Sequence, residues 1–282
     1  MSCRLQRIGA GWLAGFGGRG FILMLAGLAL SGCATTHVAR VPHHYLPVRE
    51  VTETALASPK LASLHIRGVD VSYYQGDIDW RTVRASGVTF AYIKATEGGD
   101  YLDSKFRRNW AAAKAAGIRR GAYHFYNLCR PVGDQIAWFE SHVPRDADAL
   151  PPAIDMEWVP TSTHCRAKPS RARIIADIRR FLESLERRYG KRPVIYATAS
   201  FHHDILEGFF DGYPFWLRAI DGPPGERYAF RPWHFWQYSA RGTLPGVNGH
   251  IDKNVFAGTQ AEWAKFVRGR YMDSSAIASR MD

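Results

Sequence analysis

Short apolar runs alternate with amphipathic stretches along residues 65–268. The runs have the length of β-strands, and the stretches between the first of them have helical periodicity. Alternation of this kind predicts a parallel sheet with helical crossovers. The expected strands are 65–72, 88–96, 121–127, 152–158, 193–198, 214–220, 233–239 and a segment around 250–255.

Four helices are expected between the early strands, at 80–86, 104–116, 133–142 and 170–189. The last of these has the clearest pattern, because its apolar residues recur at helical spacing and form one stripe. Ser170 is a suitable N-cap and Gly190 a suitable C-terminal stop. The stripe consists of Ile174, Ile175, Ile178, Leu182 and Leu185.

Eight strands in this order predict an α/β fold, an irregular TIM-like closed barrel. The irregularity is expected late in the chain, where short loops join the last three strands without a clear long helix. In such barrels the chemistry takes place at the carboxyl ends of the strands. Candidate catalytic residues are therefore sought where each strand ends.

Acidic residues stand near the end of four expected strands: Asp70, Glu97, the pair Asp155 and Glu157, and Asp252. Asp155 and Glu157 are two residues apart, so a strand places both on one face, about 7 Å apart. Two buried carboxyl groups this close cannot both ionise without penalty. A glycosidase needs one carboxylic acid and one carboxylate. A turn residue beside a solvated charge is the alternative interpretation.

Aromatic residues accompany these acids. Buried core explains many of them, but flat amphipathic rings also stack against sugars. They are Tyr73, Tyr74, Tyr123, Phe125, Tyr126, Trp158, Trp216, Trp236 and Tyr238.

The amino-acid composition does little to narrow the class of protein or its partners. Apolar residues make up 46% of the chain and charged residues 22%, which is ordinary for a globular protein. The formal net charge of +11 is compatible with an anionic polymer, nucleic acid or lipid headgroups. No helix-turn-helix, zinc-finger or aromatic RNA-binding motif is present, so we expect no nucleic-acid partner.

The first 32 residues have the features of a secretory signal: basic residues, an apolar run over 21–30, and then small residues. The run is short for a membrane span. It closes with Leu-Ser-Gly-Cys at 30–33, which resembles the bacterial lipobox and predicts lipidation of Cys33. Ala34 follows, and by resemblance to bacterial lipoproteins this predicts an exported protein anchored at the outer membrane, facing the periplasm. An ordinary signal peptide is the alternative.

Two cysteines, Cys129 and Cys165, remain once Cys3 and Cys33 are set aside. An even pair in an exported chain is a disulfide candidate, with two separate thiols as the alternative. No Cys or His spacing suggests a metal site, and we expect no cofactor. The polar segment 33–64 would be a flexible tether carrying the lipid, 65–268 the barrel, and 269–282 a disordered tail.

The stretches around these residues resemble glycoside hydrolase family 25, the lysozymes that act as N-acetylmuramidases. The similar stretches are RGVDVSYYQGDIDW at 67–80, FAYIKATEG at 90–98, GAYHFYN at 121–127, PPAIDMEW at 151–158, RPVIYAT at 192–198, FWLRAI at 215–220, WHFWQYS at 233–239 and HIDKNVF at 250–256. The resemblance implies a barrel of five β/α units followed by three further strands. It also implies cleavage of the β-1,4 bond between N-acetylmuramic acid and N-acetylglucosamine in peptidoglycan.

The resemblance assigns roles to individual residues. Glu157 would be the general acid, and Asp155 would position or stabilise the substrate's N-acetyl group, with Asp70 and Asp252 lining the site. At working pH we expect Glu157 to be protonated, because neighbouring acids and apolar residues surround it, and Asp155 to stay ionised. The expected substrate-binding residues are Tyr123, Trp236, Glu97, Tyr73 and Gln237.

Two features depart from the resemblance. The lipoprotein leader is one, and an insertion at 159–169 that contains Cys165 is the other. Inversion and participation by the substrate's acetamido group both remain open as mechanisms, because carboxylate separations need coordinates. A non-catalytic peptidoglycan-binding lipoprotein and a chitinase-like hydrolase are the competing functions. The intact acidic positions argue against the first, and Ala153, where a chitinase-like motif would have a further Asp, argues against the second.

Overall fold

A computed structural model of the chain describes residues 59–159, 165 and 168–270. The chain divides into two compact units, Met1–Val48 and Arg49–Asp282, and all described residues belong to the second. The expected signal peptide, Cys33 and most of the expected tether lie outside the described residues. So do residues 271–282 of the expected tail and most of the 159–169 insertion.

Eight strands close into a barrel, in the order β1-β9-β8-β7-β6-β5-β4-β2, with β2 pairing back onto β1. A short ninth strand, β3, pairs with the end of β2. The predicted mixed α/β barrel is therefore confirmed, and each of the eight expected strands is present. The strands are β1 Arg67–Val71, β2 Val88–Glu97, β3 Tyr101–Leu102, β4 Arg119–Phe125, β5 Ala153–Met156, β6 Val194–Thr198, β7 Phe215–Arg218, β8 Phe235–Gly242 and β9 Ile251–Phe256.

Seven strands of the barrel are parallel, and β9 runs antiparallel to both of its neighbours, β8 and β1. The direction of β9 follows from the short connection after β8, because parallel strands need a long crossover. The barrel thus has an amino end, where the parallel strands begin, and a carboxyl end, where they finish. Asp70, Asp155 and Glu157 lie toward the carboxyl end.

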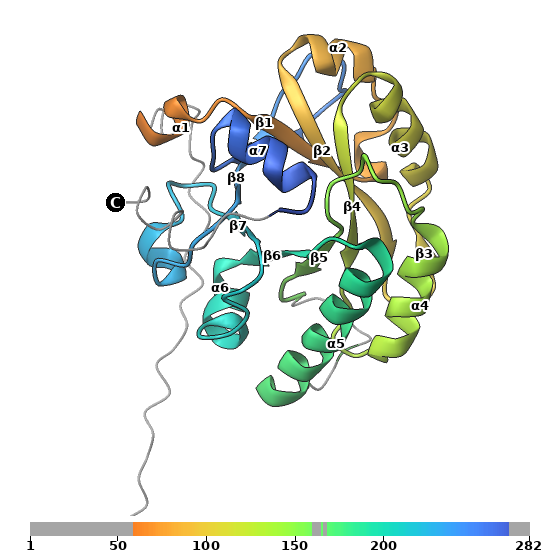
Figure 1. The fold of residues 1–282 in the computed structure, drawn as a ribbon, viewed down its shortest axis with the longest axis vertical. Coiled ribbons are helices and arrows are strands. Elements are labelled where there is room, and N and C mark those ends of the chain that lie inside the picture. The colour runs from red at the N-terminus through yellow and green to blue at the C-terminus, as the bar shows by residue number, and fades with distance from the viewer. Residues whose placement is uncertain (1–58, 160–164, 166–167, 271–282) are drawn as a thin grey trace, which may run out of the picture. The chain divides into compact units, whose positions relative to one another are not determined.

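The four predicted helices are also present: α2 Trp80–Ala85, α3 Phe106–Ala115, α4 Val132–His142 and α5 Arg171–Tyr189. Figure 1 shows them following one another around the right side of the barrel. In α5 the Ser170 side chain accepts a hydrogen bond from the Arg173 backbone N–H, as the N-cap prediction requires. Gly190 ends the helix in the left-handed conformation, at φ 68°.

Several short elements were not predicted. They are α1 Pro59–Ser63, α6 Ala199–Phe201, α7 Gln260–Val267, the 3₁₀ turns η2 Tyr73–Gln75 and η4 Gly225–Tyr228, and η3 His202–Leu206, which is a π-helix. The sequence signal for α7 was readable, because Thr259 and Glu262 form a capping box. Helix α1 lies within the segment expected to be tether, and its Leu61 is buried in the core. Leu61 therefore packs with the barrel core although it precedes residue 65.

Large aromatic side chains fill the inside of the barrel. Phe90 and Tyr92 of β2 pack there with Trp216, Phe235 and Phe256, and Trp263 and Phe266 of α7 join the same cluster. Gly68 and Gly121 make room for the two β2 rings. A Cβ on Gly68 would lie 2.3 Å from the Phe90 ring, and one on Gly121 would lie 2.4 Å from the Tyr92 ring. A second core, between the barrel wall and the outer helices, includes the predicted α5 stripe.

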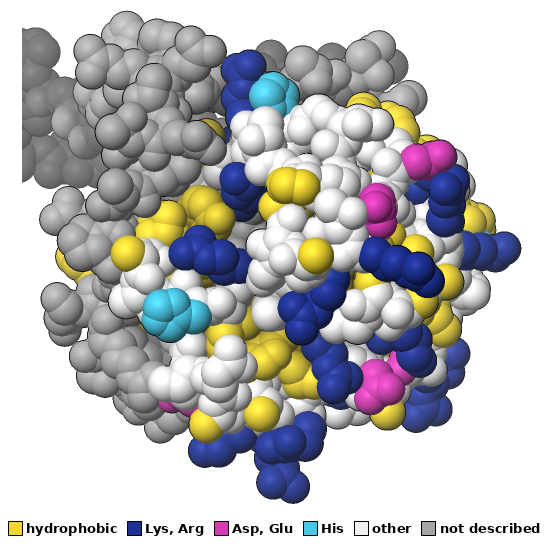
Figure 2. All heavy atoms as spheres, turned by 90° about the horizontal axis from the view of Figure 1, so that it is seen from above, with side chains coloured by type: hydrophobic (Ala, Val, Ile, Leu, Met, Phe, Trp, Pro, Cys, Tyr) yellow, Lys and Arg dark blue, Asp and Glu magenta, His cyan; other side chains and the backbone are white. Residues whose placement is uncertain are grey.

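The surface agrees with the basic composition. On the face seen in Figure 2, Lys and Arg side chains clearly outnumber Asp and Glu. None of the helices in the described part of the chain has both the length and the apolar character needed to cross a membrane.

Candidate active site

A cavity of about 230 Å³ opens at the carboxyl end of the barrel. Four of the five expected carboxyl groups line it: Asp70 from β1, Asp155 from β5, Glu157 just after β5, and Asp252 from β9. Asp70 and Asp252 are direct partners across the β1–β9 pair. Closure of the barrel therefore brings together carboxyl groups that are up to 182 positions apart in the sequence.

Two amide side chains hold Asp70. The Asn254 side-chain Nδ2 donates to Asp70 Oδ2 at 2.7 Å, and the Gln237 Nε2 donates to the same oxygen at 2.9 Å. Gln237 Nε2 also lies 3.4 Å from Asp252 Oδ2. Amide N–H groups stabilise the charged form of a carboxyl group, so this arrangement favours an ionised Asp70.

Aromatic side chains fix the orientation of both amides. The Tyr196 hydroxyl donates to Gln237 Oε1 at 3.0 Å, and Trp216 Nε1 donates to Asn254 Oδ1 at 2.7 Å. With their oxygens occupied as acceptors, both amides must present their NH₂ groups to Asp70. The network is buried, and its members come from β1, β6, β7, β8 and β9.

The pair of Asp70 and Asp252 shares one proton. Burial and the neighbouring Asp70 charge raise the pKa of Asp252 to about 9. A hydrogen bond between the two side chains raises the pKa of Asp252 further and lowers that of Asp70. Burial raises the pKa of Asp70, and the hydrogen bonds from Asn254 and Gln237 oppose that rise. The net pKa of Asp70 is still raised, and in the hydrogen bond between the two side chains Asp252 is the donor and Asp70 the acceptor.

Asp155 and Glu157 both have raised pKa values. Burial raises the pKa of Asp155 well above its usual range, and the charge of Glu157 adds to the rise. Burial also raises the pKa of Glu157, while Arg218 and Lys94 oppose that shift. The raised pKa of Glu157 has the direction expected for a protonated acid, whereas the raised pKa of Asp155 is opposite in direction to the ionised state expected for it. Asp155 lies inside the strand, whereas Glu157 lies beyond the strand end, where Arg218 and Lys94 favour its charged form.

One oxygen of Asp155 lacks a partner. Its Oδ1 atom is buried and has no hydrogen bond among the described residues. Leaving a buried polar atom unpaired costs about 1–3 kcal/mol. An unpaired carboxyl oxygen facing a cavity is a binding position for a donor on a ligand.

Lys94 was not predicted as a site residue, yet it lines the cavity. It comes from the middle of β2, and its ammonium group lies 2.7 Å from Glu97 Oε2 and 4.7 Å from the centre of the Phe125 ring. Glu97, an expected substrate-binding residue, is not part of the cavity wall and acts here as the ion-pair partner of Lys94. The signal was available, because a lysine inside an otherwise apolar strand is seldom buried without a partner or a role.

The expected substrate-binding aromatics are only partly in place. Tyr123 and Gln237 line the cavity, but Trp236 and Tyr73 do not. Trp236 precedes Gln237 on β8, so it points to the opposite side of the strand, where its Nε1 donates to the Ala219 carbonyl oxygen at 2.7 Å. The 3₁₀ turn η2 places Tyr74 and Gln75 at the cavity and leaves Tyr73 beside Tyr101. Tyr74, Phe125 and Trp216, which the sequence places among the aromatic residues near the acids, also line the cavity, and Tyr196 and Gln75 are wall residues that were not expected.

A disulfide joins Cys129 and Cys165, whose Cα atoms are 5.3 Å apart. Cys129 follows β4 and Cys165 follows β5, so the bond ties two segments at the carboxyl end of the barrel. These segments flank the strand that carries Asp155. Within the described ranges, no group of three or more His, Cys, Asp and Glu side chains is arranged to hold a metal ion.

Comparisons with known proteins agree with this geometry. Residues 69–247 match the family described as Glycosyl hydrolases family 25. The chain is 37% identical over 237 residues to the uncharacterized protein YegX of Escherichia coli O6:H1, covering 80% of this chain and 81% of that one. It is 37% identical over 209 residues to Lysozyme M1 of Streptomyces globisporus, covering 70% and 69% of the two chains.

Comparison with solved structures indicates the same family. A family 25 glycosyl hydrolase from Bacillus anthracis superposes with a TM-score of 0.66 at 36% identity, covering 72% of this chain and 94% of that one. The bacterial lysozyme of Streptomyces coelicolor gives 0.65 at 34% identity, with coverage of 74% and 99%. The barrel, the four carboxyl groups at its carboxyl end and these matches together show that the chain belongs to glycosyl hydrolases family 25.

Proposed function

We propose that this protein is a peptidoglycan hydrolase that cleaves the β-1,4 bond between N-acetylmuramic acid and N-acetylglucosamine. The observation that carries the proposal is the cavity in which Asp70, Asp155, Glu157 and Asp252 meet. Membership of a family that includes Lysozyme M1 supports it. Glycoside hydrolysis needs carboxyl groups in different protonation states, and this site contains groups with strongly raised pKa values.

Glu157 is the proposed general acid. It lies beyond the end of β5, partly exposed to solvent, where a departing glycosidic oxygen can reach it. Substrate that covers the cavity removes water from Glu157 and raises its pKa further, which favours the protonated form. Glu157 then donates its proton to the N-acetylglucosamine oxygen as the bond to the muramic acid C1 breaks. Water supplies the new hydroxyl on that carbon, and the proton that the water releases restores the acid form of Glu157.

Asp155 is proposed to bind the substrate's N-acetyl group. Its unpaired Oδ1 can accept a hydrogen bond from the acetamido N–H, which would satisfy the buried atom. Asp70, held in place by Asn254 and Gln237, would supply negative charge where positive charge develops on the sugar ring. Asp252 would keep that charge in place through their shared proton.

Tyr123 and Gln237 are the expected substrate-binding residues that lie in the cavity wall. Burial raises the pKa of Tyr123 well above its usual range, so its hydroxyl stays neutral and can donate a hydrogen bond to a sugar. Trp216, stacked on Tyr92 with ring centres 4.9 Å apart, supports the floor of the cavity.

We also propose that the protein is exported and anchored by lipid at Cys33, in the outer membrane facing the periplasm. The Leu-Ser-Gly-Cys sequence at 30–33 after an apolar run supports this proposal. One acyl chain gives marginal membrane binding, whereas two or more anchor a protein stably. Membrane fractionation of cells that carry Cys33→Ser tests it, and unchanged membrane partitioning would contradict lipid anchoring.

The enzymatic proposal is tested by incubating the protein with purified peptidoglycan and identifying the new sugar ends by mass spectrometry. N-acetylmuramic acid at the new reducing ends is the expected result. Binding to peptidoglycan without new ends would instead indicate a non-catalytic binding protein. Cleavage of chitin oligomers in preference to peptidoglycan would indicate a chitinase-like hydrolase.

A further inference from the structure

The amino end of the barrel carries a concentrated positive charge that the catalytic site does not use. Four segments meet at this end: 114–120, 143–150, 185–192 and 259–270. Together they contain eleven Lys and Arg residues and four Asp and Glu residues. Their excess of seven positive charges is a large part of the formal +11 of the whole chain.

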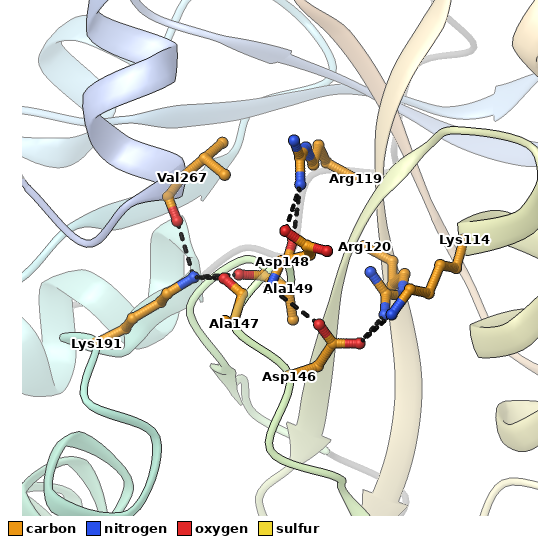
Figure 3. Close-up of polar contacts among 9 residues, drawn as sticks. All are labelled: Lys114, Arg119, Arg120, Asp146, Ala147, Asp148, Ala149, Lys191 and Val267. Carbon is orange, nitrogen blue, oxygen red and sulfur yellow. Dashed lines mark hydrogen bonds and ion pairs between the residues drawn. The ribbon is translucent and has the colours of Figure 1, made fainter.

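Figure 3 shows how these segments are joined. The Lys191 ammonium group donates to the carbonyl oxygens of Ala147, Ala149 and Val267, and so ties the end of α7 to the loop before β5. Arg119 reaches the same loop, with its Nη1 atom 3.3 Å from the Asp148 carbonyl oxygen. The four segments therefore form one continuous surface.

Part of the positive charge is neutralised within this surface. Asp146 pairs with Lys114, at 2.9 Å, and with the buried Arg120. Asp148 pairs with Arg119 at 3.4 Å. Six exposed basic residues remain for which no carboxylate partner exists among the described residues. We call these six the amino-end basic face: Arg145, Arg187, Arg188, Lys265, Arg268 and Arg270.

Helix dipoles explain only some of this charge. Arg187, Arg188 and Lys265 stand in the last turns of α5 and α7, where cations are favoured by the negative helix end. Arg145 and Arg270 lie outside helices, so no helix end accounts for them. The catalytic cavity, in contrast, opens at the opposite end of the barrel and is lined by four carboxyl groups.

The chain enters the barrel at the same amino end. Helix α1 leads directly into β1, and the Phe256 backbone N–H, just before α7, donates to the Ile66 carbonyl oxygen at 2.9 Å. The segment from Cys33 to Pro59 would reach about 90 Å if fully extended. If the chain is anchored at Cys33, a segment of that length is long enough for either end of the barrel to reach the membrane, and the charge on the barrel can then select the end that does.

We propose that the amino-end basic face docks on anionic phospholipid headgroups and so directs the catalytic cavity away from the membrane, toward the cell wall. The biological setting rests on the proposed lipid anchoring, but the binding surface itself does not. Basic residues close to an anionic bilayer are attracted within about one Debye length, roughly 10 Å at 0.1 M salt. The docking is therefore electrostatic and sensitive to salt.

The unit Arg49–Asp282, which contains every strand of the closed barrel, is the material for the test. It is sedimented with vesicles of phosphatidylcholine alone and with vesicles that also contain phosphatidylglycerol. The expected result is binding only to the vesicles with phosphatidylglycerol. This binding should fall at least tenfold when salt rises from about 0.05 M to about 0.2 M.

A charge-reversal variant locates the surface. Arg187→Glu, Arg268→Glu and Arg270→Glu together should lower binding at least tenfold. A matched control, Arg81→Glu, Arg107→Glu and Arg180→Glu, reverses three exposed charges on other parts of the barrel and should bind nearly as well as the unmodified unit. Gln versions of both triple variants guard against loss of folding, and hydrolysis of soluble peptidoglycan fragments checks that each variant is native.

Several outcomes would overturn the proposal. They are equal binding to both kinds of vesicle, equal loss in the two triple variants, and no vesicle binding by a unit that hydrolyses peptidoglycan. Binding to duplex DNA but not to vesicles would assign the face to nucleic acid instead. Vesicle binding by a unit without hydrolytic activity would leave this proposal standing and refute the proposed function.

Discussion

Replacing Asp252 with Asn should stabilise the folded protein at neutral pH while reducing its activity. Asn resembles the protonated form of Asp252, because it is neutral and can donate a hydrogen bond to Asp70. The pKa of Asp252 in the folded chain is about 9, against about 3.9 in an unfolded chain. Between these two values the folded state binds a proton that the unfolded state releases.

This difference in bound protons sets the direction in which the stability changes with pH. Because the folded state binds more protons, the stability of the unmodified protein falls as pH rises from about 4 to about 9. The slope for one group is about 1.4 kcal/mol per pH unit, so the cost at pH 7 is about 4 kcal/mol. Asp252 is only partly buried, and the solvent that reaches it reduces the expected gain in Asp252→Asn to about 2–4 kcal/mol.

The assay is urea unfolding of the unit Arg49–Asp282 and its Asp252→Asn variant at pH 4, 7 and 9, with the disulfide intact. The two proteins should be nearly equally stable at pH 4, where the carboxyl group is protonated in the folded state and still about half protonated in the unfolded state. The difference should grow at pH 7 and be largest at pH 9. A matched control is Glu183→Gln, which neutralises an exposed carboxylate on α5 and should leave the pH dependence nearly unchanged.

A pH-independent difference, or a variant less stable than the unmodified unit at pH 9, would refute the reasoning. Peptidoglycan hydrolysis by Asp252→Asn should fall, because the partner that holds the Asp70 charge in place has changed. Greater stability with lower activity is expected where a site keeps carboxyl groups in an unfavourable environment for function.

Three further predictions concern chemistry and packing. Glu157→Gln keeps the side-chain shape but removes the acidic proton, so the release of reducing ends should fall by a factor on the order of 10²–10⁴. The circular dichroism spectrum should be unchanged, and near-normal turnover would exclude Glu157 as the acid. Cys129→Ser should open the 37-residue loop that the disulfide closes and lower the free energy of unfolding by about 3–4 kcal/mol. Two free thiols in a non-reduced digest of the oxidised, unmodified protein would show that this disulfide does not form. Gly121→Ala places a methyl group 2.4 Å from the buried Tyr92 ring, and this overpacking should lower the free energy of unfolding by about 1–3 kcal/mol or more. An unchanged urea midpoint would contradict the close packing of Gly121 against Tyr92.

The sequence by itself determined the order of the strands and the long helices. Apolar runs of strand length and the amphipathic stripe of α5 are local signals, and so are the cap residues Ser170 and Gly190. The acids at the strand ends could also be gathered into one site before any coordinates, because parallel strands in a barrel finish at one rim. Asp70, Asp155 and Glu157 are found together for that reason, whereas Asp252, near the start of the antiparallel strand β9, joins them because it pairs with Asp70 across β1 and β9.

Tertiary structure decided which neighbour on a strand faces the cavity. Trp236 and Gln237 are adjacent, and β8 is buried on both sides, so no alternation of polar and apolar residues shows which one points inward. Closure of the barrel, from β2 back to β1, sets that orientation. Local sequence signals also missed η2, a single 3₁₀ turn, which presents Tyr74 and Gln75 in place of Tyr73.

Tertiary structure also decided where the protons are. Burial and charge at these groups depend on segments far away in the sequence: Lys94 acts on Asp155, and Asp70 and Arg218 act on Asp252. Desolvation depends on all the atoms that surround a group. It raises the pKa of Asp155, inside the strand, more than the pKa of Glu157, beyond the strand end. The sequence alone could identify these carboxyl groups as a pair, but only the closed barrel determines which of them keeps its proton.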